Sequence, residues 1–368
     1  MTGVRTMVAR FHERGVKVLW PNFPWDQGTR NEGRPQYEAL IDLLVATDSD
    51  GVNGDTHDCL NNTWWEYALS TGRGGFDFEP QSMGNRRGTD HTGWQSVVNN
   101  VNSWSSGWRQ SFAPLVSAYK LIEPRHLVHQ CNRHEVNKTN DIQTAYFNGG
   151  GYESWESIWG MFNQITPYHG EALRRVATIL REFGDLTSGE RFFPHVPVTT
   201  QHGVYASRFG PSAASSDYAR TLYTIVNRNA HELSGKQLTL DCSPDSRFFD
   251  VYHGRQLHTE CSQGVAALQF KLEPLGYGGV LHVQGSPTAM VELEDRLTTF
   301  LEQMKAITRR PLSSFSDEWL PLLQVQHSDP PTPVPTVAPA GMRLIPGGSY
   351  EFVAKGESEI ASITRACF

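Results

Sequence analysis

Residues 16–55 read VKVLWPNFPWDQGTRNEGRPQYEALIDLLVATDSDGVNGD, and this stretch decides the fold class. It begins with a short apolar strand that ends at Trp20, and a polar, aromatic loop follows the strand. Apolar residues then recur at helical spacing from Tyr37 to Val45, and a second strand runs from Asp50 to Asp55. A strand, a loop, a helix and another strand in this order are typical of a parallel α/β sheet.

The same order of elements continues on both sides of this stretch. Further elements are expected at residues 1–14 (helix), 64–69 (helix), 76–79 (strand), 126–131 (strand), 145–148 (strand) and 170–183 (helix). Because a closed (β/α)8 barrel has eight strands and this pattern supplies about five, we predict that residues 1–185 are the C-terminal part of a TIM-type barrel without its first three strands. A doubly wound open sheet is the alternative, although no glycine-rich phosphate loop follows any strand.

The pattern changes at about residue 190 to short β-like runs separated by Gly, Pro, Asn and Asp. These runs lie at residues 203–209, 222–227, 237–240, 248–252, 267–272 and 279–283. Short strands at such spacing are typical of an all-β sandwich, which we predict for residues 190–285. We expect a helical segment at 286–328, a Pro-rich linker at 329–340 and a short final module at 341–368.

Composition excludes several classes of partner. The formal net charge is −7 and no block of Lys or Arg occurs, which argues against nucleic acid because phosphate binding needs a clustered basic face. No run approaches the roughly 20 apolar residues of a membrane helix, so we predict no membrane partner. The five Cys show no zinc-type spacing, and no metal site is predicted. Cys242 and Cys261 flank a predicted hairpin, and the sequence allows either a disulfide between them or two free thiols.

Aromatic residues point to a carbohydrate substrate. The chain has ten Trp, most of them in its first half, where they alternate with Asp, Asn and Glu in loops. A flat aromatic ring packs against the apolar face of a sugar, while carboxylates and amides bind its hydroxyl groups; the alternative is that the Trp residues fill the core. The substrate-binding residues that we predict are Trp25, Asp26, Arg30, Asn53, His57, Glu153 and Trp155.

Carboxylates follow several of the predicted strands, where barrel enzymes carry their catalytic groups. Glycoside hydrolysis needs two carboxyl groups, one to protonate the leaving oxygen and one to attack or to activate water. The catalytic candidates are Asp55, Glu79 and Glu156, and no cofactor is expected. Glu79 follows two Phe residues, a setting that raises a carboxyl pKa as a general acid requires.

Each candidate also has a structural alternative. Asp55 is suited to an N-cap, Glu79 to a salt bridge at the rim of the site, and Glu156 to the first turn of a helix. Weaker candidates for binding sugar hydroxyls are Arg125, His126 and His129. His126 and His129 do not share a face of a strand, so they are not predicted to bind a metal together. No serine-hydrolase elbow and no P-loop sequence occurs.

Residues 341–352, GMRLIPGGSYEF, resemble the opening strand and turn of the formylglycine-generating (sulfatase-modifying factor) module. Members of that family commonly begin with Met-x-x-Ile-Pro-Gly-Gly, a small residue and an aromatic residue. The family's active cysteines lie near its far end, and Cys367 does not match their context. The resemblance therefore implies the truncated start of such a module, without its activity.

Residues 1–285 are similar to the glycoside-hydrolase-like regions that precede such modules in large bacterial-type proteins. The matching stretches are residues 15–30, 50–55, 76–80 and 152–160. The resemblance implies a barrel and hydrolysis of a glycosidic bond. A non-catalytic carbohydrate-binding protein is one alternative, and a role defined by the C-terminal module is another. Two cleft carboxyl groups about 5 Å or 6.5–9.5 Å apart would favour the enzyme.

Overall fold

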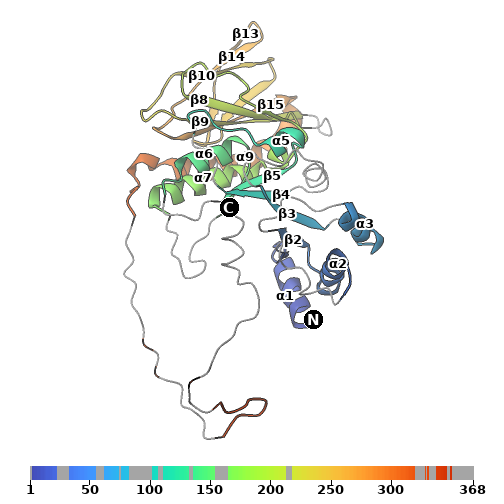
Figure 1. Cartoon of the computed structure of the whole chain (residues 1–368). Coiled ribbons are helices and arrows are strands. Elements are labelled where there is room, and N and C mark those ends of the chain that lie inside the picture. Colours follow the sequence, from blue (N-terminus) through green and yellow to red (C-terminus); the bar gives the residue numbers. More distant parts are fainter. Residues whose placement is uncertain are drawn as a thin grey trace. The chain divides into compact units, whose positions relative to one another are not determined.

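The structure is a computed structural model of the whole chain, and the chain divides into two units, Met1–Leu320 and Pro321–Phe368. It describes residues 2–22, 33–54, 62–73, 76–82, 102–106, 111–131, 136–153, 165–212, 218–319, 328, 330, 337–345 and 349. Nearly all of these residues belong to the first unit, which combines helices with parallel and antiparallel sheets (Figure 1). The linker at 329–340, the module at 341–368 and the other predicted domain boundaries stay predictions.

The first half of the chain forms a parallel sheet whose strands follow the order of the sequence (Figure 1). The strands are β1 (Leu19–Pro21), β2 (Gly51–Gly54), β3 (Asp77–Ser82), β4 (Asn102–Ser106), β5 (Leu127–Cys131) and β6 (Tyr152–Glu153). All neighbouring pairs are parallel, which confirms the α/β order expected from the sequence. In the part of the chain that the structure describes, the sheet is not closed: β1 and β6 lie at its edges.

Two helices of the first half pack on one face of the parallel sheet at its second strand. The helices of this half are α1 (Thr2–His12), α2 (Gln36–Thr47), α3 (Asn62–Ser70), α5 (Ala118–Ile122), α6 (Thr139–Phe147), α7 (Pro167–Glu182) and α8 (Gly184–Thr187). Leu40, Leu44 and Trp64 on α2 and α3 form a buried cluster with Val52 of β2. Because side chains alternate along a strand, Asn53 points to the other face of the sheet.

The predicted strand Ala145–Asn148 is wrong, because this segment ends helix α6. The Asn137 side chain accepts a hydrogen bond from the backbone N–H of Thr139 at 2.9 Å, at the start of the helix. Nearly every residue of α6 is buried, since the helix packs against both β5 and the antiparallel strand β9 (Tyr218–Asn227). A helix buried all round shows no apolar stripe in its sequence, and a short apolar run such as 145–147 then resembles a strand.

The second half of the chain is built from antiparallel strands. They are β7 (Phe192–Pro194), β8 (Val204–Phe209), β9, β10 (Lys236–Asp241), β11 (Ser246–Asp250), β12 (Arg255–Leu257), β13 (Cys261–Ser262), β14 (Val265–Gln269) and β15 (Tyr277–Gly285). They form a six-stranded sheet, in the order β12-β11-β15-β9-β8-β7, and a three-stranded sheet, in the order β10-β14-β13. Each of the six predicted β-like runs overlaps one of these strands.

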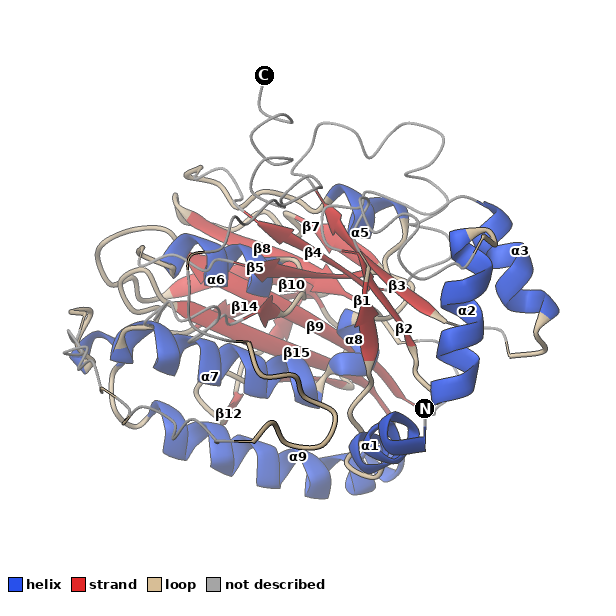
Figure 2. Cartoon of the chain, turned by 60° about the horizontal axis from the view of Figure 1, so that its bottom comes forward, coloured by secondary structure: helices blue, strands red, loops and turns tan. Residues whose placement is uncertain are grey.

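The six-stranded sheet is covered on both faces. Helices α6, α7 and α9 (Pro287–Thr308) share one buried cluster with it, and α7 and α9 run along it in Figure 2. The three-stranded sheet packs on the other face and shares a second buried cluster with the six-stranded sheet. Strand β9 shows the division, because Leu222 belongs to the helix side and Tyr223 to the sheet side. A disulfide joins Cys242, next to β10, to Cys261 of β13, so these two thiols are not free.

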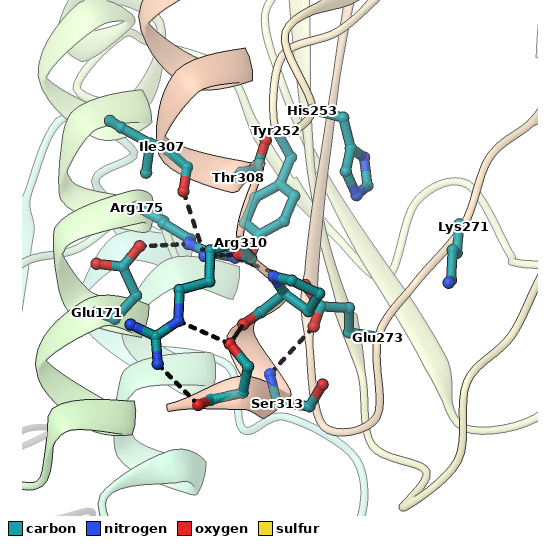
Figure 3. A network of polar contacts seen from close by, with 12 residues as sticks. Glu171, Arg175, Tyr252, His253, Lys271, Glu273, Ile307, Thr308, Arg310 and Ser313 are labelled. Atoms are coloured by element: carbon teal, nitrogen blue, oxygen red, sulfur yellow. Dashed lines mark hydrogen bonds and ion pairs between the residues drawn. The ribbon is translucent and has the colours of Figure 1, made fainter. Parts of the chain in front are cut away.

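A buried arginine ties helix α7 to the antiparallel half (Figure 3). Arg175 is 0% exposed, and its guanidinium donates to Glu171 Oε1 at 2.8 Å and to the Arg310 carbonyl at 2.6 Å. It also donates to the Tyr252 hydroxyl at 3.3 Å, and Glu273 lies 3.5 Å away. These contacts join α7, the end of β11 and the chain beyond α9 through one cation.

Candidate functional site

The candidate site begins with Glu79 on β3, a carboxyl that is only 8% exposed. Glu79 is the register partner of Asn53 on β2, so the two side chains share the face opposite the helices α2 and α3. The Asn53 side-chain amide donates to Glu79 Oε2 at 3.2 Å. The structure thus brings together two residues predicted from the sequence, one as catalytic and one as substrate-binding.

Glycine at the start of β2 allows this register. A Cβ at Gly51 would lie 2.0 Å from the carbonyl oxygen of Asp77, the register partner of Gly51 on β3. No side chain fits at such a distance. Substitution of Gly51 would push β2 and β3 apart, and Asn53, two residues further along, would move away from Glu79.

His129 on β5 completes the site. Its Nε2 atom makes a hydrogen bond with Glu79 Oε1, and Glu79 thereby has a partner on each of its carboxyl oxygens. Strand β4 lies between β3 and β5, so this bond spans an intervening strand. In a flat sheet two such strands are about 10 Å apart. Contact between alternate strands is favoured on a concave face, as in a barrel, where alternate strands supply one layer of side chains.

The pair of Glu79 and His129 can be reached by a ligand. The side chain of His129 is 24% exposed and that of Glu79 is 11% exposed. Gly151, just before β6, leaves the space beside the ring free of a side chain, since a Cβ there would contact the Cβ of His129 at 3.4 Å. An imidazole bonded to a carboxyl group can hold or pass a proton beside it, which is the chemistry of general acid and base catalysis.

Other predicted site residues lie outside the described part of the chain. They are Trp25, Asp26, Arg30, Asp55, His57, Trp155 and Glu156. The backbone of Glu153 forms part of β6 and pairs in register with Cys131 of β5. These positions therefore stay predictions.

Arg125 and His126, expected to bind sugar hydroxyls, come just before the first residue of β5, at its amino end. Arg125 forms an ion pair with Glu123 at 2.8 Å, and His126 is fully buried and stacks on Tyr119. Only His129 of the three weaker candidates reaches the site. Its signal in the sequence is a polar residue inside the apolar run of β5.

Within the described ranges, no group of three or more His, Cys, Asp or Glu side chains is arranged to hold a metal ion. None of the helices described is both long enough and apolar enough to span a bilayer.

The chain is similar in structure to several carbohydrate-active enzymes. A proposed α-N-acetylgalactosaminidase from Bacillus halodurans is 9% identical over 77% of this chain and 78% of its own, with a TM-score of 0.40. An α-glucosyl transfer enzyme is 10% identical over 67% of each chain, with a TM-score of 0.36. A trehalulose synthase mutant is 9% identical over 71% of this chain and 70% of its own, with a TM-score of 0.33. Similarity this distant does not bear on activity. No family model and no curated protein sequence matches the chain.

Proposed function

We propose that the protein is a glycoside hydrolase in which Glu79 is one of the two reacting carboxyl groups. The observation that carries this proposal is the placement of Glu79: a buried carboxyl on a parallel sheet, bonded by Asn53 on one side and by His129 on the other. A carboxyl held in a fixed position by two partners is suited to transfer a proton to a bound glycosidic oxygen.

The proposed architecture is a partial (β/α)8 barrel at residues 1–185 followed by a β-sandwich at 190–285. Two features support the barrel: the strands are parallel in sequence order, and Glu79 contacts His129 across β4. The sandwich is supported by a buried cluster to which both antiparallel sheets contribute, including Leu238 of β10 and Ile225 of β9.

In the proposed reaction, Glu79 donates its proton to the oxygen of the leaving sugar as the bond between that oxygen and the anomeric carbon breaks. A second carboxylate attacks the anomeric carbon or activates a water molecule that does so. We propose Asp55 for this role, because it follows Asn53 by two residues and residues two apart on a strand point to the same face. Glu156 is the alternative candidate. The proposed sugar-binding residues besides Asn53 are Trp25, Asp26, Arg30, His57, Glu153 and Trp155.

The experiment that tests the proposal compares wild-type protein with Glu79→Gln on a panel of aryl glycosides. The substitution keeps the size and the hydrogen bonds of the side chain but removes its titratable proton. We expect kcat to fall by about 10²–10⁴-fold while sugar binding is retained. His129→Asn should lower kcat less, because the carboxyl remains but loses a partner.

The matched control is Glu66→Gln on the exposed surface of α3, which should keep the wild-type rate. A wild-type rate in Glu79→Gln would show that this carboxyl is structural. If the wild-type protein binds sugars but turns over none of the glycosides, the carbohydrate-binding alternative replaces the enzyme.

A further inference from the structure

A basic groove lies on the antiparallel half of the protein, between helix α9 and the turn that joins β11 to β12. Its volume is about 690 Å³. Its charged lining consists of His253, Arg255, Lys271, Glu302, Lys305 and Arg309. His253 and Lys271 are labelled in Figure 3, beside the Arg175 network. The groove shares no residue with the parallel sheet that carries Glu79.

The turn between β11 and β12 sits directly on helix α9. Gly254 has a φ of +67°, and a Cβ at this position would lie 2.0 Å from the Leu301 carbonyl oxygen and 2.5 Å from the Lys305 nitrogen. Only glycine allows this approach, since the left-handed conformation is also unfavourable for other residues. The contact fixes His253 and Arg255, on either side of Gly254, beside the basic residues of α9.

A buried carboxylate anchors the strand side of the groove. Asp250 is 1% exposed and bonds to His253 Nδ1 at 2.8 Å and to Arg255 Nε at 3.3 Å. The Arg255 side chain is still 53% exposed, so part of its guanidinium faces the groove. Lys271 pairs with Glu232 at 2.5 Å, but both side chains remain about half exposed, as surface ion pairs are, and can exchange partners.

The helix side of the groove carries two cations, Lys305 and Arg309, and one acidic residue, Glu302. Glu302, Lys305 and Arg309 lie three and four residues apart and so share one face of α9. Among the residues that the structure describes, neither Lys305 nor Arg309 forms an ion pair. Like charges one turn apart repel each other. The helix dipole favours cations at this end of α9, but it does not explain why Arg255 of β12 and Lys271, from the segment after β14, converge on them.

We propose that this groove binds the sulfate or carboxylate groups of an anionic oligosaccharide, where the charge of the ligand follows from the lining and its sugar part rests on the proposed function. Arg and Lys are the side chains that best bind oxyanions, and four of them converge here in a chain of net charge −7. The volume exceeds what one oxyanion needs and lies in the range of small-molecule sites. The lining contains no Trp, Tyr or Phe, so recognition depends on charge rather than on stacking against a sugar ring.

Calorimetric titration of the full chain tests this inference with three probes: a disulfated disaccharide, its unsulfated parent and inorganic sulfate. We expect only the sulfated disaccharide to bind tightly, with an affinity that falls as salt increases. Lys305→Ala and Arg309→Ala should each weaken it about tenfold, because each removes a charge-assisted hydrogen bond.

Lys236→Ala, which removes an exposed cation on β10 outside the groove, is the matched control and should bind as the wild type does. Three results would overturn the inference: no binding of the sulfated disaccharide, an equal loss in the Lys236 variant, or equally tight binding of inorganic sulfate. Because the experiment measures binding alone, its outcome does not depend on whether Glu79 proves to be catalytic.

Discussion

Replacing Arg175 by Met should destabilise the protein strongly, because Met fills the space but removes a buried cation. The Glu171 carboxylate, 7% exposed, loses its buried partner at 2.8 Å and keeps the half-exposed Arg174, and the carbonyl groups of Ile307 and Arg310 lose their donor. Removing one partner of a buried ion pair costs about 3–5 kcal/mol. The two carbonyl groups are only partly buried, so each adds less than the cost of about 1–3 kcal/mol for a fully buried unsatisfied group.

The free energy of unfolding can be measured by urea denaturation, with the fluorescence of the ten Trp residues as the signal. An unfolding entropy of about 2.1 cal/mol/K per residue over the unit Met1–Leu320 corresponds to about 1.5 °C per kcal/mol, so the expected loss also lowers the thermal midpoint by about 4–8 °C. Arg174→Met is the matched control. Arg174 bonds to the same Glu171 at 2.7 Å, but it is half exposed, and exposed pairs contribute about 1 kcal/mol or less.

The double variant Glu171→Gln/Arg175→Met isolates the cost of a buried carboxylate that keeps only the half-exposed Arg174 as its arginine partner. We expect it to be more stable than Arg175→Met alone, because the carboxylate that lost its buried partner is gone. Equal losses in the Arg174 and Arg175 variants, or a double variant whose loss is the sum of the two single losses, would refute the reasoning.

Two further predictions concern the antiparallel half. The Cys242–Cys261 disulfide closes a loop with a sequence separation of 19, so replacing both cysteines by Ser should lower the free energy of unfolding by about 3 kcal/mol. Identical stability of the wild type before and after reduction would contradict this prediction. Burial lowers the pKa of His282 to about 4, so the unfolded chain binds the extra proton between about pH 6.5 and pH 4, and stability falls as the pH drops through that window. His282→Gln should flatten this part of the stability curve by up to about 3 kcal/mol, and an unchanged slope would show that other groups cause it.

The parallel order of the first half could be predicted from the sequence because each short strand is followed by a polar loop. Strand β4 could not. Its sequence, NSWSS at Asn102–Ser106, has few residues that favour strands, and its backbone is held by pairing with β3 and β5. Strand formation here depends on neighbours distant in the sequence, which no local pattern shows.

The site shows the same limit. Glu79 and Asn53 could be selected because each belongs to a strand that leads into a polar loop. The bond between Glu79 and His129 joins residues 50 positions apart and spans a strand, so it depends on the curvature of the sheet. Periodicity gives the face on which a side chain lies, but not which side chain it meets on that face.

Helix α6 has a practical consequence for any attempt to divide the chain. Gln143 donates to the carbonyl groups of Asn227 and Leu275 at 2.9 and 2.8 Å, and Tyr146 donates to that of Gly278 at 3.0 Å. The same helix packs against β5, which carries His129. A cut near residue 185 would therefore expose a helix whose residues are nearly all buried in the intact chain. Each half, expressed alone, should be insoluble or poorly folded, whereas the two halves produced together should reassemble around α6.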